Sequence, residues 1–354
     1  MPSPEAKQAL AIDGSLGEGG GQVLRTSLSL AVITSRAFAM RNIRRRRAKP
    51  GLMAQHLKAV EAAAAVGLAR VEGARIGSQE LLFEPAGIRS GDFHFDIGTA
   101  GATSLVLETI LLPLSFAPRR SQVTLVGGTH VPWSPCFHYL EWHWLRYMRQ
   151  IGFRGGLELQ AAGFYPRGGG RVRATVEPCS GLAPLQLTER GLLRRIRGIS
   201  AVANLNLSVA ERQKQRALER LRGVTDSIEI EITRLTSPSK GTLLLLLAEF
   251  EKAQCCFYGL GALRKPAERV ADEAVSELQD FLDTDGAVDH YLADQLVLPL
   301  ALASGTSEVR TSRVTEHLAT NVEIVKMFLP VAIEISAEIG KPGSIQIRGA
   351  KLPP

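Results

Sequence analysis

A glycine-rich segment near the N-terminus carries two side chains that could act on a phosphate group. Residues 13–22 read DGSLGEGGGQ, and a helix-like stretch follows. Glycines let the backbone approach a ligand closely, and the free N–H groups at a helix N-terminus suit phosphate. Glu18 could offer a carboxylate to a metal ion, and Arg25 a cation to a phosphate. The segment is neither a Walker A loop nor a G-x-G-x-x-G motif, so a plain tight turn is the alternative interpretation.

A basic run follows at residues 41–49, which read RNIRRRRAK. Arginine presents a planar fork of N–H donors that matches phosphate oxygens. If this run formed a strand, Arg45 and Arg47 would lie on one side of it. Arg44 and Arg46 would lie on the other side. The run is a candidate phosphate-binding segment, and a solvated charge run is the alternative.

Four further side chains near the C-terminus could serve chemistry. None of the seven histidines has metal-ligand spacing, so a histidine metal cluster is not expected. His317 stands in the polar stretch TEHLATN near a helix start, where a surface or capping role is the alternative. Tyr291, Asp294 and Gln295 share one face of a predicted helix, a pattern that an ordinary half-buried helix also shows.

The elements that must position these residues recur along the chain. Hydrophobic periodicity predicts units that each contain two helices and about four strands. In the first unit we expect strands at 9–13 and 38–43 and near Val71 and Leu81, and helices at 22–34 and 52–66. In the second we expect strands at 92–97 and 122–126, helices at 103–114 and 137–151, and strands flanking the glycines at 168–170.

A third copy of this pattern is predicted near the C-terminus. The segment AQHLKAVEAAA, from Ala54, matches TEHLATNVEIV, from Thr315, and places His56 and His317 at equivalent positions. We expect helices at 292–302 and 316–328 and strands at 307–310 and 345–348.

The predicted fold is α+β, with three repeats of a two-helix, four-stranded unit and a smaller inserted α+β domain. Residues 1–183 would hold the first two repeats. Residues 184–274 do not fit the repeat and would form the insertion. Residues 275–354 would hold the third repeat.

Composition limits the class of protein. The chain has 354 residues, 45% of them hydrophobic and 22% charged, which is typical of a globular protein with a large core. The net charge of +7 suits a polyanionic partner without proving one. Four cysteines without C-x-x-C spacing, no signal-peptide pattern and no membrane-length apolar run predict a reduced, cytoplasmic protein without a zinc site or membrane contact.

The chain resembles the RNA 3′-terminal phosphate cyclase family. The matching phrases, in chain order, are DGSLGEGGGQ, RAKPGLMAQHL, IGTAGATSLVL, GGTHVPWSP, GFYPRGGG, HYLADQLVLP and HLATN. The resemblance covers residues 9–329 and is weakest across the insertion. It implies the fold of three repeats with an inserted domain. It also implies a reaction in which ATP drives conversion of an RNA 3′-phosphate to a 2′,3′-cyclic phosphate, giving AMP and pyrophosphate.

The resemblance further implies roles for individual residues. His317 would attack the ATP α-phosphorus and carry a covalent AMP. Glu18 would lie near Mg²⁺ or Mn²⁺, and Arg25 near the ATP phosphates. Contacts to the RNA terminal phosphate would come from Arg44 and Arg47, with Gln55 and His56 nearby. The nucleotide pocket would be lined by Tyr291, Asp294, Gln295 and Glu108, with Pro135 and Phe257 as apolar walls.

Glu108 departs from the family pattern. The well-known bacterial members carry a glutamine at this helix position, and an ionised glutamate cannot donate a hydrogen bond as an amide does. Glu108 either accepts from the adenine amino group or a ribose hydroxyl, or it binds the metal or a basic neighbour. We favour the first, because the position matches the family's nucleotide-facing glutamine.

Three other functions remain as alternatives. A lysine-type nucleotidyltransferase needs K-x-D-G, but the corresponding residues 11–14 read AIDG, so the nucleophilic lysine is missing. A catalytically inactive, cyclase-like RNA-binding protein of ribosome assembly would keep the fold without the chemistry, and the presence of His317, Glu18 and Arg25 argues against it. A generic RNA-binding module lacks support, because no aromatic-rich stacking motif occurs.

Overall fold

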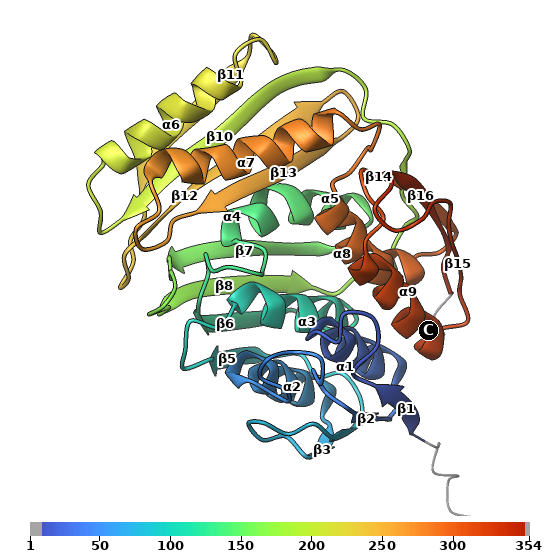
Figure 1. Ribbon diagram of the computed structural model, residues 1–354. Helices are drawn as coiled ribbons and strands as arrows, with labels where there is room; N and C mark the ends of the chain where they lie inside the picture. The colour runs from blue at the N-terminus through green and yellow to red at the C-terminus, as the bar shows by residue number, and fades with distance from the viewer. Residues whose placement is uncertain (1–8, 351–354) are drawn as a thin grey trace, which may run out of the picture.

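A computed structural model describes residues 9–350 and contains four four-stranded sheets (Figure 1). Each sheet combines one parallel pair of strands with two antiparallel pairs. The α+β class expected from the sequence is confirmed. Among residues 9–350, no helix is both long and apolar enough to cross a membrane.

The first two sheets have the same connectivity. The first sheet has the strand order β1-β2-β4-β3. Its unit comprises β1 (Leu10–Asp13), α1 (Gln22–Thr34), β2 (Phe38–Arg41), α2 (Ala54–Gly67), β3 (Arg70–Glu72) and β4 (Leu81–Glu84). The second, in the order β5-β6-β8-β7, comprises β5 (Asp92–Asp96), α3 (Thr103–Ser115), β6 (Ser121–Gly127), α4 (Phe137–Tyr139), the π-helix η1 (Leu140–Trp144), α5 (Leu145–Gln150), β7 (Arg154–Ala161) and β8 (Gly170–Glu177).

The third sheet repeats this order with strands from both sides of a long insertion. It comprises β9 (Gln186–Leu187), α8 (His290–Ala301), β14 (Thr306–Thr311), α9 (Glu316–Phe328), β15 (Ala332–Ile335) and β16 (Gly343–Arg348). Strand β9 pairs in parallel with β14, although we assigned residues 184–274 to the insertion. This boundary was wrong at its start, because β9 is too short to be recognised without its distant partner.

The inserted segment forms the fourth sheet, in the order β11-β10-β12-β13. It comprises β10 (Leu193–Ala203), α6 (Ser208–Arg220), β11 (Ile228–Arg234), β12 (Gly241–Phe250), β13 (Gln254–Leu260) and α7 (Ala267–Leu282). Helix α7 packs against α6 and β13, so the segment continues past the boundary expected at residue 274. The leucine run of β12 is buried on both faces, because one face lies under α6 and α7 and the other joins the main core.

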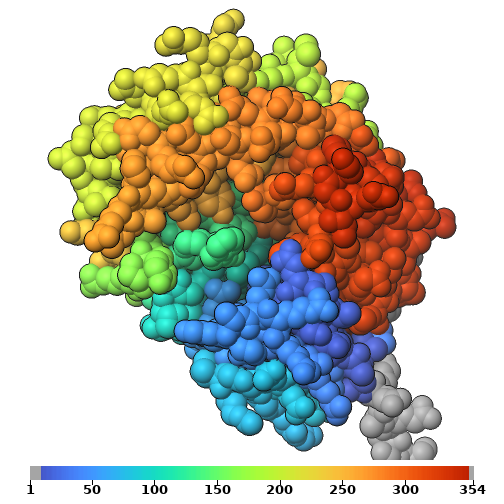
Figure 2. All heavy atoms as spheres, in the orientation of Figure 1, coloured from blue at the N-terminus to red at the C-terminus, as the bar shows by residue number. Residues whose placement is uncertain are grey.

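The helices of the three similar units pack against one another. Helix α1 contacts α2, α3 and α9, while α8 contacts α9. Figure 1 shows these helices between the sheets, which lie toward the outside. Most of the polar residues singled out in the sequence lie at the starts of these helices or in the loops before them, whereas Glu108 lies in the middle of α3. Figure 2 shows a hollow on one face, bounded by blue, teal and orange segments of the chain.

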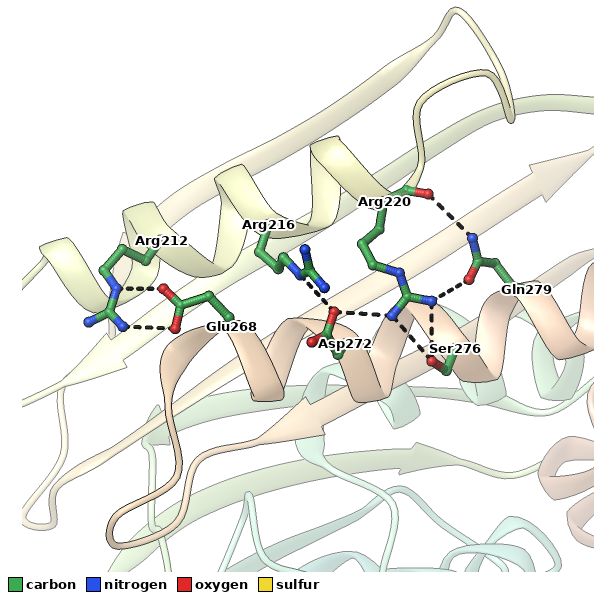
Figure 3. A network of polar contacts seen from close by, with 7 residues as sticks. All are labelled: Arg212, Arg216, Arg220, Glu268, Asp272, Ser276 and Gln279. Atoms are coloured by element: carbon green, nitrogen blue, oxygen red, sulfur yellow. Dashed lines mark hydrogen bonds and ion pairs between the residues drawn. The ribbon is translucent and has the colours of Figure 1, made fainter.

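The two helices of the inserted segment are joined by a row of charged contacts (Figure 3). Arg212 forms a two-bond pair with Glu268, with N–O distances of 2.7 and 2.8 Å. Asp272 accepts from Arg216 at 2.8 Å and from Arg220 at 3.1 Å. Three ion pairs in series fix the two helices side by side more firmly than one isolated surface pair would.

We expect Asp272→Asn to lower the free energy of unfolding at pH 7 by about 0.5–1 kcal/mol. Burial raises the pKa of Asp272, but Arg216 and Arg220 more than offset this and hold it below its usual value. A depressed native pKa stabilises the fold above the unfolded pKa, and this stability is lost as pH falls through the native pKa. Urea unfolding at pH 7 and pH 3 should therefore show a difference that shrinks at pH 3. Asp280→Asn, at an exposed position on the same helix, is the matched control and should change little.

Candidate active site

Glu18 and His317 come from opposite ends of the chain and are hydrogen-bonded to each other. His317 lies in the first turn of α9, where Thr315 Oγ1 caps the helix by accepting from the Leu318 N–H at 3.0 Å. His317 Nδ1 is 2.9 Å from Glu18 Oε1. A carboxylate only accepts, so Nδ1 carries a proton, and the neutral form of the ring would keep its lone pair on Nε2. The His317 side chain is 45% exposed, so this nitrogen is open to an electrophile.

Glycine is required at two positions beside Glu18. Gly17 has a φ of +55°, and a Cβ there would lie 1.8 Å from Thr320 Oγ1 on α9. At Gly21, directly before α1, a Cβ would lie 2.5 Å from His56 Nε2 and 2.8 Å from Arg25 Nη1. The segment is thus a turn, but one that brings the backbone against three elements of the site.

The arginine run is a compact loop rather than a continued strand. Strand β2 ends at Arg41, and Arg44 has a φ of +54°. The predicted alternation was therefore wrong, because a left-handed residue reverses the chain where a strand would continue it. Arg46 donates to the Gly17 carbonyl at 2.8 Å, and Arg47 Nη2 lies 3.1 Å from Glu18 Oε2. Neighbouring arginines thus reach the same glycine loop.

Arg44 points into its own loop. Its Nη1 donates to the carbonyls of Lys49 at 2.8 Å and Gly51 at 2.9 Å. Burial lowers its pKa, and the charge of Arg47 lowers it further. Arg44 therefore holds the loop closed and adds positive charge beside Arg47.

A layer of charged and amide side chains lies behind the exposed histidine. Asp294 Oδ1 accepts from Gln22 Nε2 at 2.6 Å and from Asn321 Nδ2 at 3.1 Å. Asn321 Oδ1 in turn accepts from Thr26 Oγ1 at 2.7 Å. These contacts join α1, α8 and α9 at one point. The sequence reasoning did not assign Gln22, Thr26 or Asn321 to the site, although Gln22 ends the glycine motif and Asn321 lies one helical turn after the candidate nucleophile.

Arg25 lies near two carboxylates, Glu108 and Asp294. Burial lowers the pKa of Arg25, whereas the charges of Glu108 and Asp294 raise it. Gln295 Nε2 is 2.5 Å from Glu108 Oε1, which links α8 to α3. Burial raises the pKa of Glu108 to about 7, with Arg25 acting in the opposite direction. Burial also raises the pKa of Asp294, opposed first by the nearby His317.

His56 and Gln55 occupy the first turn of α2 beside this layer. His56 is buried, and burial, followed by the charges of Arg25 and Arg44, lowers its pKa to about 3. The ring is therefore neutral at pH 7. Gln55 Oε1 accepts from the Ala102 N–H at 2.8 Å, which ties α2 to the residue before α3.

The residues expected to form the walls of the nucleotide pocket separate into two groups. Tyr291 is half exposed at the start of α8, and Pro135 is partly buried. Phe257 is buried against α7, with its ring 5.8 Å from that of Phe281, so it does not line the site. We did not predict β13, and without the strand its facing could not be assigned. The next residue, Tyr258, faces the other way and donates to the Ser134 carbonyl at 2.7 Å.

A buried network that the sequence did not reveal anchors α8. Asp289 caps the helix by accepting from the Leu292 N–H at 2.9 Å and also accepts from Tyr139 at 3.2 Å. His143, on the π-helix, lies 2.6 Å from Asp289 Oδ2. Burial raises the pKa of Asp289, but His143 outweighs this and holds it below the usual value. The network fixes the helix that carries Tyr291, and an aspartate directly before a predicted helix is its only signal in the sequence.

The arrangement can bind a polyanion and attack it. The start of α1, Arg25 and the arginine loop place positive charge and free N–H groups around one exposed imidazole nitrogen. A carboxylate suited to a metal ion touches both that imidazole and Arg47. This combination fits attack by histidine on a nucleotide phosphate.

Comparisons with known proteins agree with this chemistry. A family model described as RNA 3′-terminal phosphate cyclase matches residues 16–335. A protein of that name from Ralstonia nicotianae is 46% identical over 339 residues, covering 96% of this chain and 95% of the relative. One from Pseudomonas fluorescens is 45% identical, covering 93% and 94%. One from Desulfurococcus amylolyticus is 42% identical, covering 98% and 99%. With the match spanning nearly the whole of each protein, the chain belongs to the RNA 3′-terminal phosphate cyclase family.

Proposed function

We propose that this enzyme uses ATP to convert an RNA 3′-terminal phosphate to a 2′,3′-cyclic phosphate, with His317 as the nucleophile that carries AMP. The observation that supports this assignment best is the hydrogen bond from His317 Nδ1 to Glu18 beside the glycine loop. In the neutral ring this bond places the proton on Nδ1, so that Nε2 would be free to attack while Glu18 holds the ring in place.

The reaction needs activation because an RNA 3′-phosphate has no group that can leave when the 2′-OH attacks. First, His317 Nε2 bonds to the ATP α-phosphorus, and the bond to pyrophosphate breaks. Next, an oxygen of the RNA 3′-phosphate attacks that phosphorus and displaces the imidazole, which forms an RNA–AMP anhydride. Finally, the 2′-oxygen bonds to the 3′-phosphorus, its proton leaves to solvent, and AMP departs.

The surrounding residues would bind and orient these groups. Arg25 and the start of α1 would hold the triphosphate, and Arg44 and Arg47 the RNA terminal phosphate. Tyr291 and Pro135 would flank the base. Asp294 and Gln295 would contribute polar contacts.

A single carboxylate, Glu18, suits a divalent ion that is also held by substrate phosphates better than it suits an ion held by protein ligands alone. Within residues 9–350, no group of three or more histidine, cysteine or acidic side chains is arranged to hold a metal. Mg²⁺ is often held by one or two carboxylates together with substrate phosphates, which a single Glu18 suits, and Mn²⁺ also prefers oxygen ligands. When bound, such an ion would neutralise charge on the triphosphate.

Incubation with ATP labelled at the α-phosphate tests the proposal. A labelled, acid-labile protein band on a denaturing gel is expected, and an RNA with a 3′-phosphate should then remove the label and gain a cyclic end. The absence of any band, from folded protein supplied with Mg²⁺ or Mn²⁺, would indicate a binding protein instead.

Arg44→Ala and Arg47→Ala should each slow AMP transfer and cyclisation more than self-adenylation. The reason is that these side chains belong to the arginine loop, while Arg25 serves ATP from α1. Single-turnover assays with preformed enzyme–AMP separate the steps. Arg45→Ala is the matched control, since the Arg45 side chain donates to Asn42 Oδ1 in its own loop, at 3.2 Å. Equal losses at every step would point to an ATP role or a folding defect.

A further inference from the structure

Two carboxylates lie near one guanidinium in the candidate nucleotide site. Arg25 on α1 interacts with Glu108 on α3 and with Asp294 on α8. All three residues are only partly exposed. Two carboxylates that share a poorly solvated site do not both ionise readily, so one cation does not balance the pair. The cluster is therefore expected to retain one proton.

His317 acts on Asp294 but not on Glu108, and no other described group that faces Glu108 supplies the missing charge. On α2, His56 is neutral, and Lys58 is paired with Glu61 at 2.5 Å. On α8, His290 has its pKa lowered to about 4 by burial, so it too is neutral. Strands β6 and β8, on which α3 packs, bury only side chains that do not titrate.

The hydrogen bonds decide which carboxyl keeps the proton. Asp294 Oδ1 accepts from two amide N–H groups, those of Gln22 and Asn321, and such bonds favour the ionised form. Glu108 has one hydrogen-bond partner among the described residues, the side-chain amide of Gln295. The proton therefore belongs on Glu108.

The contact between Glu108 and Gln295 fits a protonated acid. The two atoms are 2.5 Å apart, a separation typical of O–H···O bonds and short for N–H···O. Gln295 Oε1 is buried and, among residues 9–350, has no hydrogen-bond partner. Because the two ends of an amide are interchangeable by rotation, Glu108 can donate to Gln295 Oε1.

We propose that Glu108 is a neutral carboxylic acid in the ATP-bound enzyme and acts as a specificity residue, both donating and accepting hydrogen bonds as an amide would. The inference rests on the proposed function, because it places ATP beside α3 and α8. The pKa of about 7, raised by burial, means that the acid loses its proton within the physiological range unless ATP holds it there.

Calorimetry of ATP-analogue binding tests the proposal. The probe is α,β-methylene-ATP, which cannot adenylate His317, titrated into the full-length protein at pH 6, 7 and 8 in buffers of different ionisation enthalpy. Wild type should bind the analogue about tenfold more weakly at pH 8 than at pH 6, after the change seen in Glu108→Gln is subtracted. The reason is that Glu108, with a pKa of about 7, must take up a proton to bind the analogue at pH 8. At pH 8 wild type should also take up nearly one more proton per ligand than E108Q. Titration of the analogue itself is common to both proteins and cancels.

Equal pH dependence and equal proton uptake in the two proteins would overturn the proposal. A folding defect in E108Q would not obscure the answer, because ¹³C NMR of the glutamate side chains in wild type reports the same ionisation directly. One carboxyl carbon should remain in the protonated range at pH 7 with the analogue bound, and none doing so would equally overturn it. Self-adenylation with labelled ATP distinguishes failure of the cyclase assignment from failure of the role proposed for Glu108. A labelled band with no protonated glutamate leaves the cyclase assignment intact and rejects the role of Glu108, whereas no binding and no band rejects both.

Discussion

Replacement of His317 by alanine should abolish the covalent AMP adduct and leave the protein folded. Self-adenylation should fall by more than ~10³-fold, because the other site residues position ATP without offering a nucleophile. The fold should survive because the side chain is 45% exposed and the N-terminus of α9 is capped by Thr315. Labelled ATP measures the adduct, and circular dichroism checks the fold.

His317→Asn is the sharper variant for the same test. Its amide NH₂ can still donate to Glu18, so the local hydrogen bond is kept while the nucleophilic nitrogen is lost. Both variants should therefore fail alike. A well-folded alanine variant that still takes up label would show that the nucleophile lies elsewhere.

Removal of the Arg25 charge should disturb both catalysis and stability. Arg25→Met would leave Glu108 and Asp294 without their shared cation. We expect the free energy of unfolding to fall by about 1 kcal/mol or less, because Glu108 and Asp294 lose a nearby positive charge that opposes the effect of their burial. Self-adenylation should be lost, because the triphosphate would lie near the side chains of Glu108 and Asp294 without the guanidinium of Arg25 to bind it.

The pH dependence of this loss has a definite sign. Without Arg25 the native pKa values of both carboxyls rise further above their unfolded values. A raised native pKa costs no stability below the unfolded pKa and costs progressively more as pH rises above it. Urea unfolding should show a larger deficit at pH 8 than at pH 5.

Two comparison variants separate charge from shape. Arg25→Lys keeps the charge and should recover most of the stability. Adding Glu108→Gln to Arg25→Met removes one acid and should recover part of it. An Arg25→Met deficit that is the same at pH 5 and pH 8 would mean that the guanidinium is not paired with these carboxyls.

The sequence predicted the elements that local periodicity specifies and failed where distant contacts decide. Helix α1 runs from Gln22 to Thr34 and α9 from Glu316 to Phe328, with the limits expected from their apolar spacing. The arginine loop was interpreted as a strand because the spacing of charged residues does not reveal which residues adopt a left-handed backbone conformation. Strand β9 has two residues, and its partner lies more than a hundred positions away, so no local pattern could identify it.

Much the same limit applies to the candidate site. Motif phrases indicated Glu18, Arg25 and His317, and the structure brings Glu18 within hydrogen-bond distance of His317. The facing of Phe257 depends on pairing within an unpredicted strand, and the Asp289–His143 contact joins residues 146 positions apart. Such contacts follow from packing between units, which a single sequence does not display.

The split origin of the third sheet has a consequence for how the enzyme is made. Strand β9 leaves the ribosome before the inserted segment, yet its partner β14 is synthesised only afterwards. Because domains generally fold as units in order of synthesis, the first two units can form while this strand still waits for its neighbour. A nascent chain at that stage already holds Glu18 and Arg25 but not the histidine of α9. Chains broken off during translation would therefore carry the phosphate-binding part of the enzyme and consume no ATP.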